Sequence, residues 1–274
     1  MAILEAVILA MIQGFTEFLP ISSSAHLAMA PWLLGWKDQG LTFDIALHFG
    51  TLLAVLIYFY RDWLQITAQA FGMSYAPDRD LAQSKHMLWW MLAATIPVGI
   101  SGLLLQDMAQ TQLRRPLVIG GMLAGVGVLM LAADKVSKRN KEIQSVTLLD
   151  ALVIGAAQAL AVIPGTSRSG ITVIAGLFCN LDRPTAARFS FLLSTPAIAA
   201  AAFKASLDVV QQGGIPSPMW VPFFAGITVS AITGLLVIDI FLTFLRRNTL
   251  TFFVCYRVLF GIIVIALAFF RGTL

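Results

Sequence analysis

Two polar segments interrupt apolar stretches of this 274-residue chain, and their residue types could carry phosphoryl chemistry. The first, Gln13 to His26, reads Gln-Gly-Phe-Thr-Glu-Phe-Leu-Pro-Ile-Ser-Ser-Ser-Ala-His. In it, Glu17 offers a carboxylate, three consecutive serines (22–24) offer hydroxyls, and His26 can serve as acid, base or nucleophile near neutral pH. The second, Pro164-Gly-Thr-Ser-Arg-Ser-Gly170, offers Arg168, whose planar guanidinium can hold phosphate oxygens in pairs.

Other residues of the two segments are expected to bind substrate through hydroxyl, amide or backbone groups. Each segment is expected to open a short helix, where free N–H groups and the helix dipole favour an anion. The expected set is Gln13, Ser22, Ser24, Gly165, Thr166, Ser167 and Ser169. Serine and threonine also satisfy backbone groups freed at a helix break, so a structural role is the alternative for Ser22, Ser24, Thr166 and Ser169.

Three further points concern charged residues in apolar surroundings. Arg257 lies within the last apolar segment, where a cation normally faces a cavity or a partner, here Asp239 or substrate phosphate, so we add it to the substrate-binding set. His48 is predicted to be a packed or interfacial histidine. Glu17 and Arg168 could form a purely structural ion pair, but the neighbouring serines and histidine favour chemistry.

The composition places these segments in a membrane protein. Hydrophobic residues make up 58% of the chain and charged residues 12%, whereas soluble domains have roughly 25% charged residues. The net charge of +4 could suggest a nucleic-acid partner, but the cations are spread over short loops between apolar segments. Membrane topology explains that distribution, and no nucleic-acid partner is expected.

The hydrophobic pattern predicts an all-α polytopic membrane protein with about six spans. About 20 residues are needed to cross the hydrocarbon core. The predicted spans are 43–60, 86–106, 117–133, 185–207, 220–245 and 252–270. Two other apolar regions, 2–36 and 148–181, are broken by proline and polar residues, which predicts two re-entrant helical hairpins whose tips are the polar segments.

An internal repeat relates the two hairpins. Glu5 stands eight residues before Gln13, as Asp150 stands eight before Gln158, and Pro20 aligns with Pro164 when one residue is omitted. Each hairpin is followed by three spans, so the second must enter from the opposite face. The prediction is a single membrane domain, 1–274, built of inverted repeats 1–147 and 148–274, with both tips near the midplane. The two acids are expected to cap their half-helices.

Basic residues orient this topology, because cytoplasmic loops collect lysine and arginine. One predicted face carries Arg61, Arg79, Lys85, Lys135, Lys138, Arg139, Lys141, Arg183, Arg246 and Arg247, and the other carries Lys37, Arg114, Arg115 and Arg271. Both termini and the mouth of the first hairpin are therefore expected to face outward, and the second hairpin is expected to enter from the cytoplasm.

Together the two segments resemble the bacitracin-resistance family of undecaprenyl-diphosphate phosphatases, in motif order, chain length and span layout. The resemblance implies removal of the terminal phosphate of undecaprenyl diphosphate, which regenerates the lipid carrier for peptidoglycan synthesis at the bacterial inner membrane. It also implies a divalent cation, Mg²⁺ or Ca²⁺, with Glu17 as its ligand, and catalytic roles for Glu17, Ser23, His26 and Arg168. The family motif often has glutamate where this chain has Gln13, so a second carboxylate is missing from this motif.

Several alternatives stay open at this stage. Ser23 or His26 could be the nucleophile, or His26 could activate water. A transporter or flippase for a polyprenyl phosphate or small anion is the competing function, because inverted repeats with broken helices are typical of secondary transporters. The lipid product could also be flipped by the enzyme itself. The partners expected are the lipid substrate and membrane lipid, with a homodimer as the candidate oligomer.

Overall fold

The computed structural model describes residues 2–37, 39–81, 85–211, 214–215 and 217–272, and this part of the chain is helical. Short 3₁₀ turns connect several helices, the longest being η4 (Ala159–Val162). The α-helices are α1 (Ile3–Phe18), α2 (Ser23–Leu34), α3 (Leu41–Tyr58), α4 (Tyr60–Ala70), α5 (Met87–Gln110), α6 (Pro116–Val136), α7 (Leu148–Gln158), α8 (Arg168–Phe178), α9 (Arg183–Gln211), α10 (Trp220–Leu245) and α11 (Thr251–Arg271). An all-α membrane protein is confirmed.

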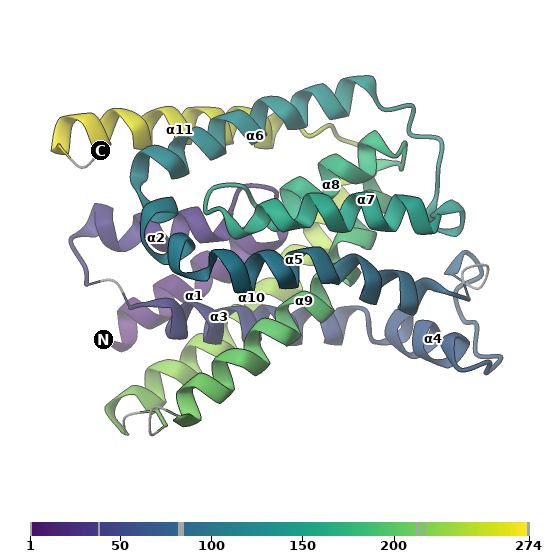
Figure 1. Cartoon of the computed structure of the whole chain (residues 1–274), viewed down its shortest axis with the longest axis horizontal. Coiled ribbons are helices and arrows are strands. Elements are labelled where there is room, and N and C mark those ends of the chain that lie inside the picture. Colours follow the sequence, from purple (N-terminus) through teal and green to yellow (C-terminus); the bar gives the residue numbers. More distant parts are fainter. Residues whose placement is uncertain (1, 38, 82–84, 212–213, 216, 273–274) are drawn as a thin grey trace.

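Among the described residues, five helices are long and apolar enough to cross a membrane, and α3 with α4 makes a sixth if the pair counts as one bent span. These correspond to the six predicted segments. Helix α4 turns away from α3 by 75° and was not predicted from the sequence. It lies at the end of the molecule opposite both termini (Figure 1).

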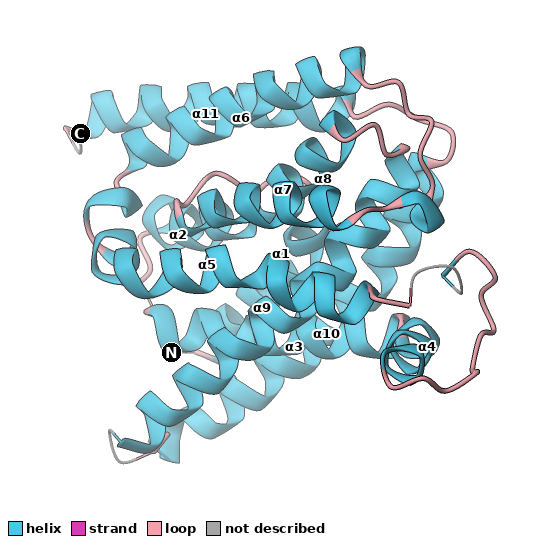
Figure 2. Cartoon of the chain, turned by 45° about the vertical axis from the view of Figure 1, so that its right-hand side comes forward, coloured by secondary structure: helices cyan, strands magenta, loops and turns pink. Residues whose placement is uncertain are grey.

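The two predicted helical hairpins are present, as α1 with α2 and α7 with α8. In Figure 1, α1 begins at the end of the molecule that holds both termini, whereas α7 begins at the opposite end. The hairpins therefore enter from opposite sides, as inverted topology requires. Figure 2 shows α7 and α8 between the α6–α11 pair and the layer that contains α3, α9 and α10.

Both predicted acidic caps are present. The Glu5 carboxylate accepts the backbone N–H of Ala2 at 3.2 Å. Asp150 accepts the backbone N–H of Thr147 at 2.9 Å and also pairs with Lys141 at 3.0 Å. Each half-helix thus begins with an acid that satisfies free N–H groups and suits the helix dipole.

Close packing of small residues holds the helices around the tips. In lipid, helix association depends on close backbone approach rather than on removal of apolar surface from water. A Cβ on Gly261 of α11 would lie 2.6 Å from the carbonyl oxygen of Gly120 on α6. Phe18, at the end of α1, is fully buried, and its ring packs edge-on against Phe191 of α9 with centroids 5.2 Å apart. The first contact holds α6 against α11, and the second fixes the end of the half-helix α1 in the interior.

Candidate active site

The first tip turns the chain between α1 and α2 through a serine cap. Ser22 adopts φ +75°, a left-handed conformation that non-glycine residues rarely adopt, and its hydroxyl accepts the backbone N–H of Ala25 at 3.4 Å. The Ser24 hydroxyl lies 3.2 Å from that of Ser22. Ser22 is thus engaged as a cap, and Ser23, the first residue of α2, is left half-buried at the helix start.

The second tip repeats this geometry at α8. Ser167 has φ +70°, its hydroxyl accepts the backbone N–H of Gly170 at 3.1 Å, and Ser169 lies 3.3 Å away from it. Ser22 and Ser167 each stand nine residues after Gln13 and Gln158, respectively. The structural repeat therefore needs no gap, and the expected alignment of Pro20 with Pro164 is wrong.

With this register, Ser23 and Arg168 occupy equivalent positions, each the first residue of its second half-helix. The cap serine, rather than the proline, sets the register, because the cap determines where each helix begins.

The two tips meet at the carboxylate of Glu17. Its Oε1 accepts a hydrogen bond from Arg168 of the second tip at 2.5 Å. Its Oε2 accepts hydrogen bonds from the Ser23 hydroxyl and from Nε2 of Gln13, the latter at 3.0 Å. Ser169 adds another bond between the tips, because its hydroxyl donates to the Leu19 carbonyl oxygen at 3.1 Å. The sequence could predict this meeting of the tips only through the repeat.

Burial differs across this group in a way that suits a reaction. Glu17 is 4% exposed and Gln13 is fully buried, whereas Ser23, His26 and Arg168 are only half-buried. The carboxylate is therefore held in the interior, while Ser23, His26 and Arg168 remain within reach of a ligand. A low-dielectric, preorganised site of this kind strengthens electrostatic interactions with a reacting anion.

His26 does not face Ser23. Its Nδ1 lies 2.7 Å from the Ser22 carbonyl oxygen, which can only accept, so Nδ1 carries the hydrogen. Its Nε2 lies 2.6 Å from the hydroxyl of Tyr256 on α11. Because both ring nitrogens are engaged, Ser23 has Glu17 rather than His26 as its proton acceptor in this arrangement.

His48 lies at the site, although its sequence context predicted a packed or interfacial histidine. Its Nε2 is 3.5 Å from Glu17 Oε2, and its Nδ1 lies 2.7 Å from the Asp44 carbonyl oxygen. The interpretation of His48 as a packing residue is therefore corrected. Tyr256 was also missed. A histidine inside a predicted span and a tyrosine next to Arg257 were the available signals, but neither residue type shows by itself which helix it faces.

Arg257 lies fully buried between the tips and donates to backbone carbonyl oxygens. Its Nη1 bonds Pro20 of the first tip at 3.0 Å, and its Nη2 bonds Gly165 and Thr166 of the second tip at 2.8 and 3.0 Å. The expected partner Asp239 instead accepts the hydroxyl of Tyr58 at 2.9 Å. These contacts make Arg257 a clamp on the two turns, and its expected binding of substrate stays a prediction.

Gly165 explains why the second tip can come so close to α6. It has φ +94°, and a Cβ there would lie 2.6 Å from the carbonyl oxygen of Ile119. Only glycine fits this position without strain. The carbonyl of Gly165 is thereby directed to Arg257.

Several buried polar atoms of the site residues have no hydrogen-bond partner among the residues that the structure describes. They are Gln13 Oε1, Thr166 Oγ1 and Arg168 Nη1, and both amide atoms of Gln158 are in the same state. Buried polar groups are normally paired, so such atoms indicate where a ligand or solvent is bound. Three of the four residues belong to the expected site, and Gln158 is the repeat equivalent of Gln13.

The donor set does not fit a resident divalent cation. Among the described residues, no group of three or more His, Cys, Asp and Glu side chains is placed to hold a metal ion. Glu17 brings one carboxylate, and Arg168 already donates to one of its oxygens. Mg²⁺ is usually held by one or two carboxylates together with substrate phosphates, so Glu17 and Gln13 alone would leave most of its coordination unfilled.

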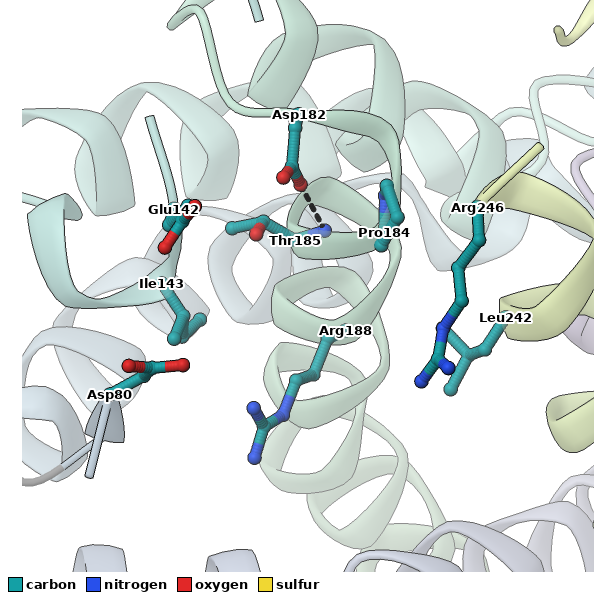
Figure 3. Close-up of a pocket in the computed structure, with 9 residues that line it drawn as sticks. All are labelled: Asp80, Glu142, Ile143, Asp182, Pro184, Thr185, Arg188, Leu242 and Arg246. Carbon is teal, nitrogen blue, oxygen red and sulfur yellow. Dashed lines mark hydrogen bonds between the residues drawn. The ribbon is translucent and has the colours of Figure 1, made fainter. Parts of the chain in front are cut away.

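A separate pocket of about 340 Å³ lies where α9 begins and α10 ends (Figure 3). Its lining mixes acids with Arg188 and Arg246, and Asp182 caps α9 by accepting the backbone N–H of Thr185 at 2.7 Å. None of the expected site residues lines it. Arg188 is paired with Asp62 and Asp78, both at 2.7 Å, so this pocket is part of a charged clamp on α4 and the loop after it.

Comparisons with known proteins agree with the motifs. The family model described as bacitracin resistance protein BacA matches residues 6–263. A protein of Gemmatimonas aurantiaca named undecaprenyl-diphosphatase is 45% identical, over 97% of this chain and 98% of its own length. Proteins with the same name from Thermodesulfovibrio yellowstonii and Moorella thermoacetica are 46% and 41% identical, over 98% and 99% of this chain and 98% and 100% of their own lengths.

Proposed function

This chain belongs to the bacitracin resistance protein BacA family, and we propose on that premise that it is an undecaprenyl-diphosphatase, removing the terminal phosphate of undecaprenyl diphosphate. The observation that carries the mechanism is the junction at Glu17, where one carboxylate holds the hydroxyl of Ser23 and the guanidinium of Arg168 from opposite repeats. A nucleophile and an anion-binding group thus each lie within hydrogen-bond reach of one proton acceptor.

Binding of the diphosphate falls to Arg168 and the helix starts. Within the described part of the chain, Nη1 of Arg168 and the hydroxyl oxygen of Thr166 have no hydrogen-bond partner. Free N–H groups at the beginnings of α2 and α8 add positive potential from two directions. The terminal phosphate is then held against Ser23, and its negative charge is stabilised during transfer.

The transfer itself uses Ser23 and Glu17. Ser23 Oγ attacks the terminal phosphorus while its proton passes to Glu17 Oε2, which already accepts that hydrogen bond. The bond from phosphorus to the bridging oxygen breaks, and undecaprenyl phosphate leaves. Water then attacks the phosphoseryl group, inorganic phosphate leaves, and Ser23 Oγ recovers a proton from Glu17.

His26 has a separate role in this proposal. Its hydrogen bonds to Ser22 and Tyr256 place it beside the first helix start, with its ring stacked on that of Phe260 at 4.9 Å between centroids. It would orient the turn and exchange protons with the leaving phosphate. The alternative, in which His26 is itself the nucleophile, requires its ring to leave Tyr256.

The arrangement of the membrane spans also bears on where the protein is located and how it is oriented. The chain is a multi-pass membrane protein. We propose that it lies in the bacterial inner membrane with the site opening outward, supported by the excess of basic residues at the end that holds α4 and the linker between α6 and α7. The polyprenyl tail would stay in lipid between helices. A homodimer remains an expectation from the sequence.

The test is phosphate release from undecaprenyl diphosphate by purified protein in detergent, for wild type and for Glu17→Ala, Ser23→Ala, His26→Ala and Arg168→Ala. Release by wild type, with loss in the Glu17, Ser23 and Arg168 variants, would support the proposal. No release by folded wild type at any prenyl length would refute it. The relatives support this function rather than the transporter alternative.

A further inference from the structure

Glu17 has a counter-ion already built into the chain. Arg168 Nη2 lies 2.5 Å from Oε1, and the side chains are 15% and 3% exposed. The other oxygen, Oε2, accepts from Ser23 and Gln13 and has His48 Nε2 at 3.5 Å. Both oxygens of the carboxylate are therefore surrounded, and its charge is balanced without a metal ion.

Gln13 reinforces this arrangement. It stands four residues before Glu17 on the same face of α1, where a second acid would form a two-carboxylate site. Instead its amide N–H donates to Glu17, and its own oxygen remains unpartnered and buried. One oxygen ligand is thus available beside the carboxylate, but no second carboxylate is present in this motif to offset the charge of Arg168 when no phosphate is bound.

A cation entering this resting site would meet Arg168 at close range. Two positive charges a few ångströms apart repel strongly where water is largely excluded. The diphosphate changes the balance, because it draws Arg168 to phosphate and supplies oxygen ligands of the kind that Mg²⁺ prefers.

We propose that Arg168 is the resting counter-ion of Glu17, and that a divalent cation is carried in with the diphosphate and is not bound by the free protein. Glu17 Oε1, freed by Arg168, and the amide oxygen of Gln13 would then help to hold the cation together with phosphate oxygens, while Oε2 stays the proton acceptor of Ser23. The proposal rests on the proposed function for its ligand, but its first part concerns the free protein alone.

The experiment measures Mn²⁺ binding to purified protein by the loss of the free-ion electron paramagnetic resonance signal, without any turnover. Wild type and the charge-conserving control Arg168→Lys should bind Mn²⁺ no tighter than about 1 mM, the range of weak oxygen sites. Arg168→Gln and Gln13→Glu should each strengthen binding by about tenfold or more, because the first removes a positive charge and the second adds a negative one. The double variant Glu17→Gln/Arg168→Gln should return to the wild-type value.

A second arm adds a methylene-bridged farnesyl diphosphonate, which cannot be hydrolysed at the bridge. Wild type should then bind about one Mn²⁺ per chain, and Glu17→Gln should not. Micromolar binding of Mn²⁺ by the free wild type would overturn the proposal. It would also be overturned if neither Arg168→Gln nor Gln13→Glu bound Mn²⁺ more tightly than wild type does. Failure of wild type to recruit Mn²⁺ with the diphosphonate would overturn it as well.

The two proposals fail in different ways. An absence of phosphate release refutes the phosphatase function. The measurement of Mn²⁺ binding to the free protein uses no substrate, so its result depends only on the charges of Glu17, Gln13 and Arg168. Thermal unfolding of each variant, compared with wild type, shows that the binding change belongs to a folded protein.

Discussion

At the scale of residues, one carboxylate connects the whole site. Glu17 accepts hydrogen bonds from Gln13 on its own helix, from Ser23 on α2 and from Arg168 on α8. All four residues were expected at the site: Glu17 and Arg168 because charges at membrane depth are costly unless they function, Gln13 as a binding residue, and Ser23 through the family resemblance. The sequence did not identify His48, since a lone histidine in a span is equally typical of packing.

The role of Glu17 as proton acceptor leads to the first prediction. Glu17→Gln keeps the size of the side chain but removes the base, so the rate of phosphate release should fall by about 10²- to 10⁴-fold. Glu5→Gln is the matched control, since it makes the same chemical change at the start of α1. Steady-state release in detergent measures both. A Glu17→Gln enzyme within about tenfold of wild type would contradict the role.

The second prediction identifies the nucleophile. Rapid acid quenching of turnover with terminally ³²P-labelled substrate should trap acid-stable label on Ser23, because Ser23 already bonds its proton acceptor and both nitrogens of His26 are engaged. The label should persist in His26→Ala and vanish in Ser23→Ala. Acid-labile label that depends on His26 would assign the attack to the histidine.

At the scale of elements, helix starts and a buried arginine determine where the tips lie. The six spans and two hairpins were predictable because the lengths of the apolar segments, and the prolines and polar residues that interrupt two of them, can be read from the sequence. The register of the repeat and the partners of Arg257 were not predictable. Serine caps rather than prolines set the register. Arg257 contacts backbone carbonyl groups, which every residue has, so no residue type indicates these partners.

The clamp formed by Arg257 leads to the third prediction. Arg257→Gln leaves buried carbonyls of both tips unsatisfied and should lower the free energy of unfolding by at least about 3 kcal/mol. Arg271→Gln is the control, because Arg271 sits at the exposed end of α11 and donates to Trp32. Thermal unfolding in detergent compares them. Equal effects of the two substitutions would show that Arg257 does not hold the tips.

The charged clamp on the loop after α4 leads to a prediction about pH. Burial would raise the pKa of Asp78, but hydrogen bonds from Arg188 and from the backbone of Asp80 and Leu81 outweigh it and hold the pKa below its usual value of 3.8. A depressed pKa means that the ionised form stabilises the fold. This stabilisation is complete above about pH 3.8 and is lost as pH falls through the lower folded value.

Asp78→Asn should therefore be less stable than wild type by about 1 to 3 kcal/mol at pH 7, and the difference should shrink below pH 4. Asp80→Asn is the neighbouring control, since no ion pair joins its carboxylate to Arg188 among the described contacts. Thermal unfolding at both pH values measures the change. A difference that stays constant with pH would exclude ionisation of Asp78 as its source.

At the scale of the whole molecule, inverted topology brings two chemically different tips to one place. The first tip supplies the acid and the hydroxyl, and the second supplies the arginine, so neither repeat holds a complete site. The repeat predicted their meeting near the midplane. The repeat could not predict the bend of 75° before α4, because the apolar pattern ends there and does not indicate a change of direction.

The most direct test of the phosphatase mechanism is to run the reaction in ¹⁸O-labelled water and to analyse both products by mass spectrometry. Attack by Ser23 on the terminal phosphorus, followed by water, predicts ¹⁸O in the released inorganic phosphate and none in undecaprenyl phosphate. Label in undecaprenyl phosphate would place the attack on the other phosphorus. It would thereby contradict the assignment of the terminal phosphate to the site formed by Glu17, Ser23 and Arg168.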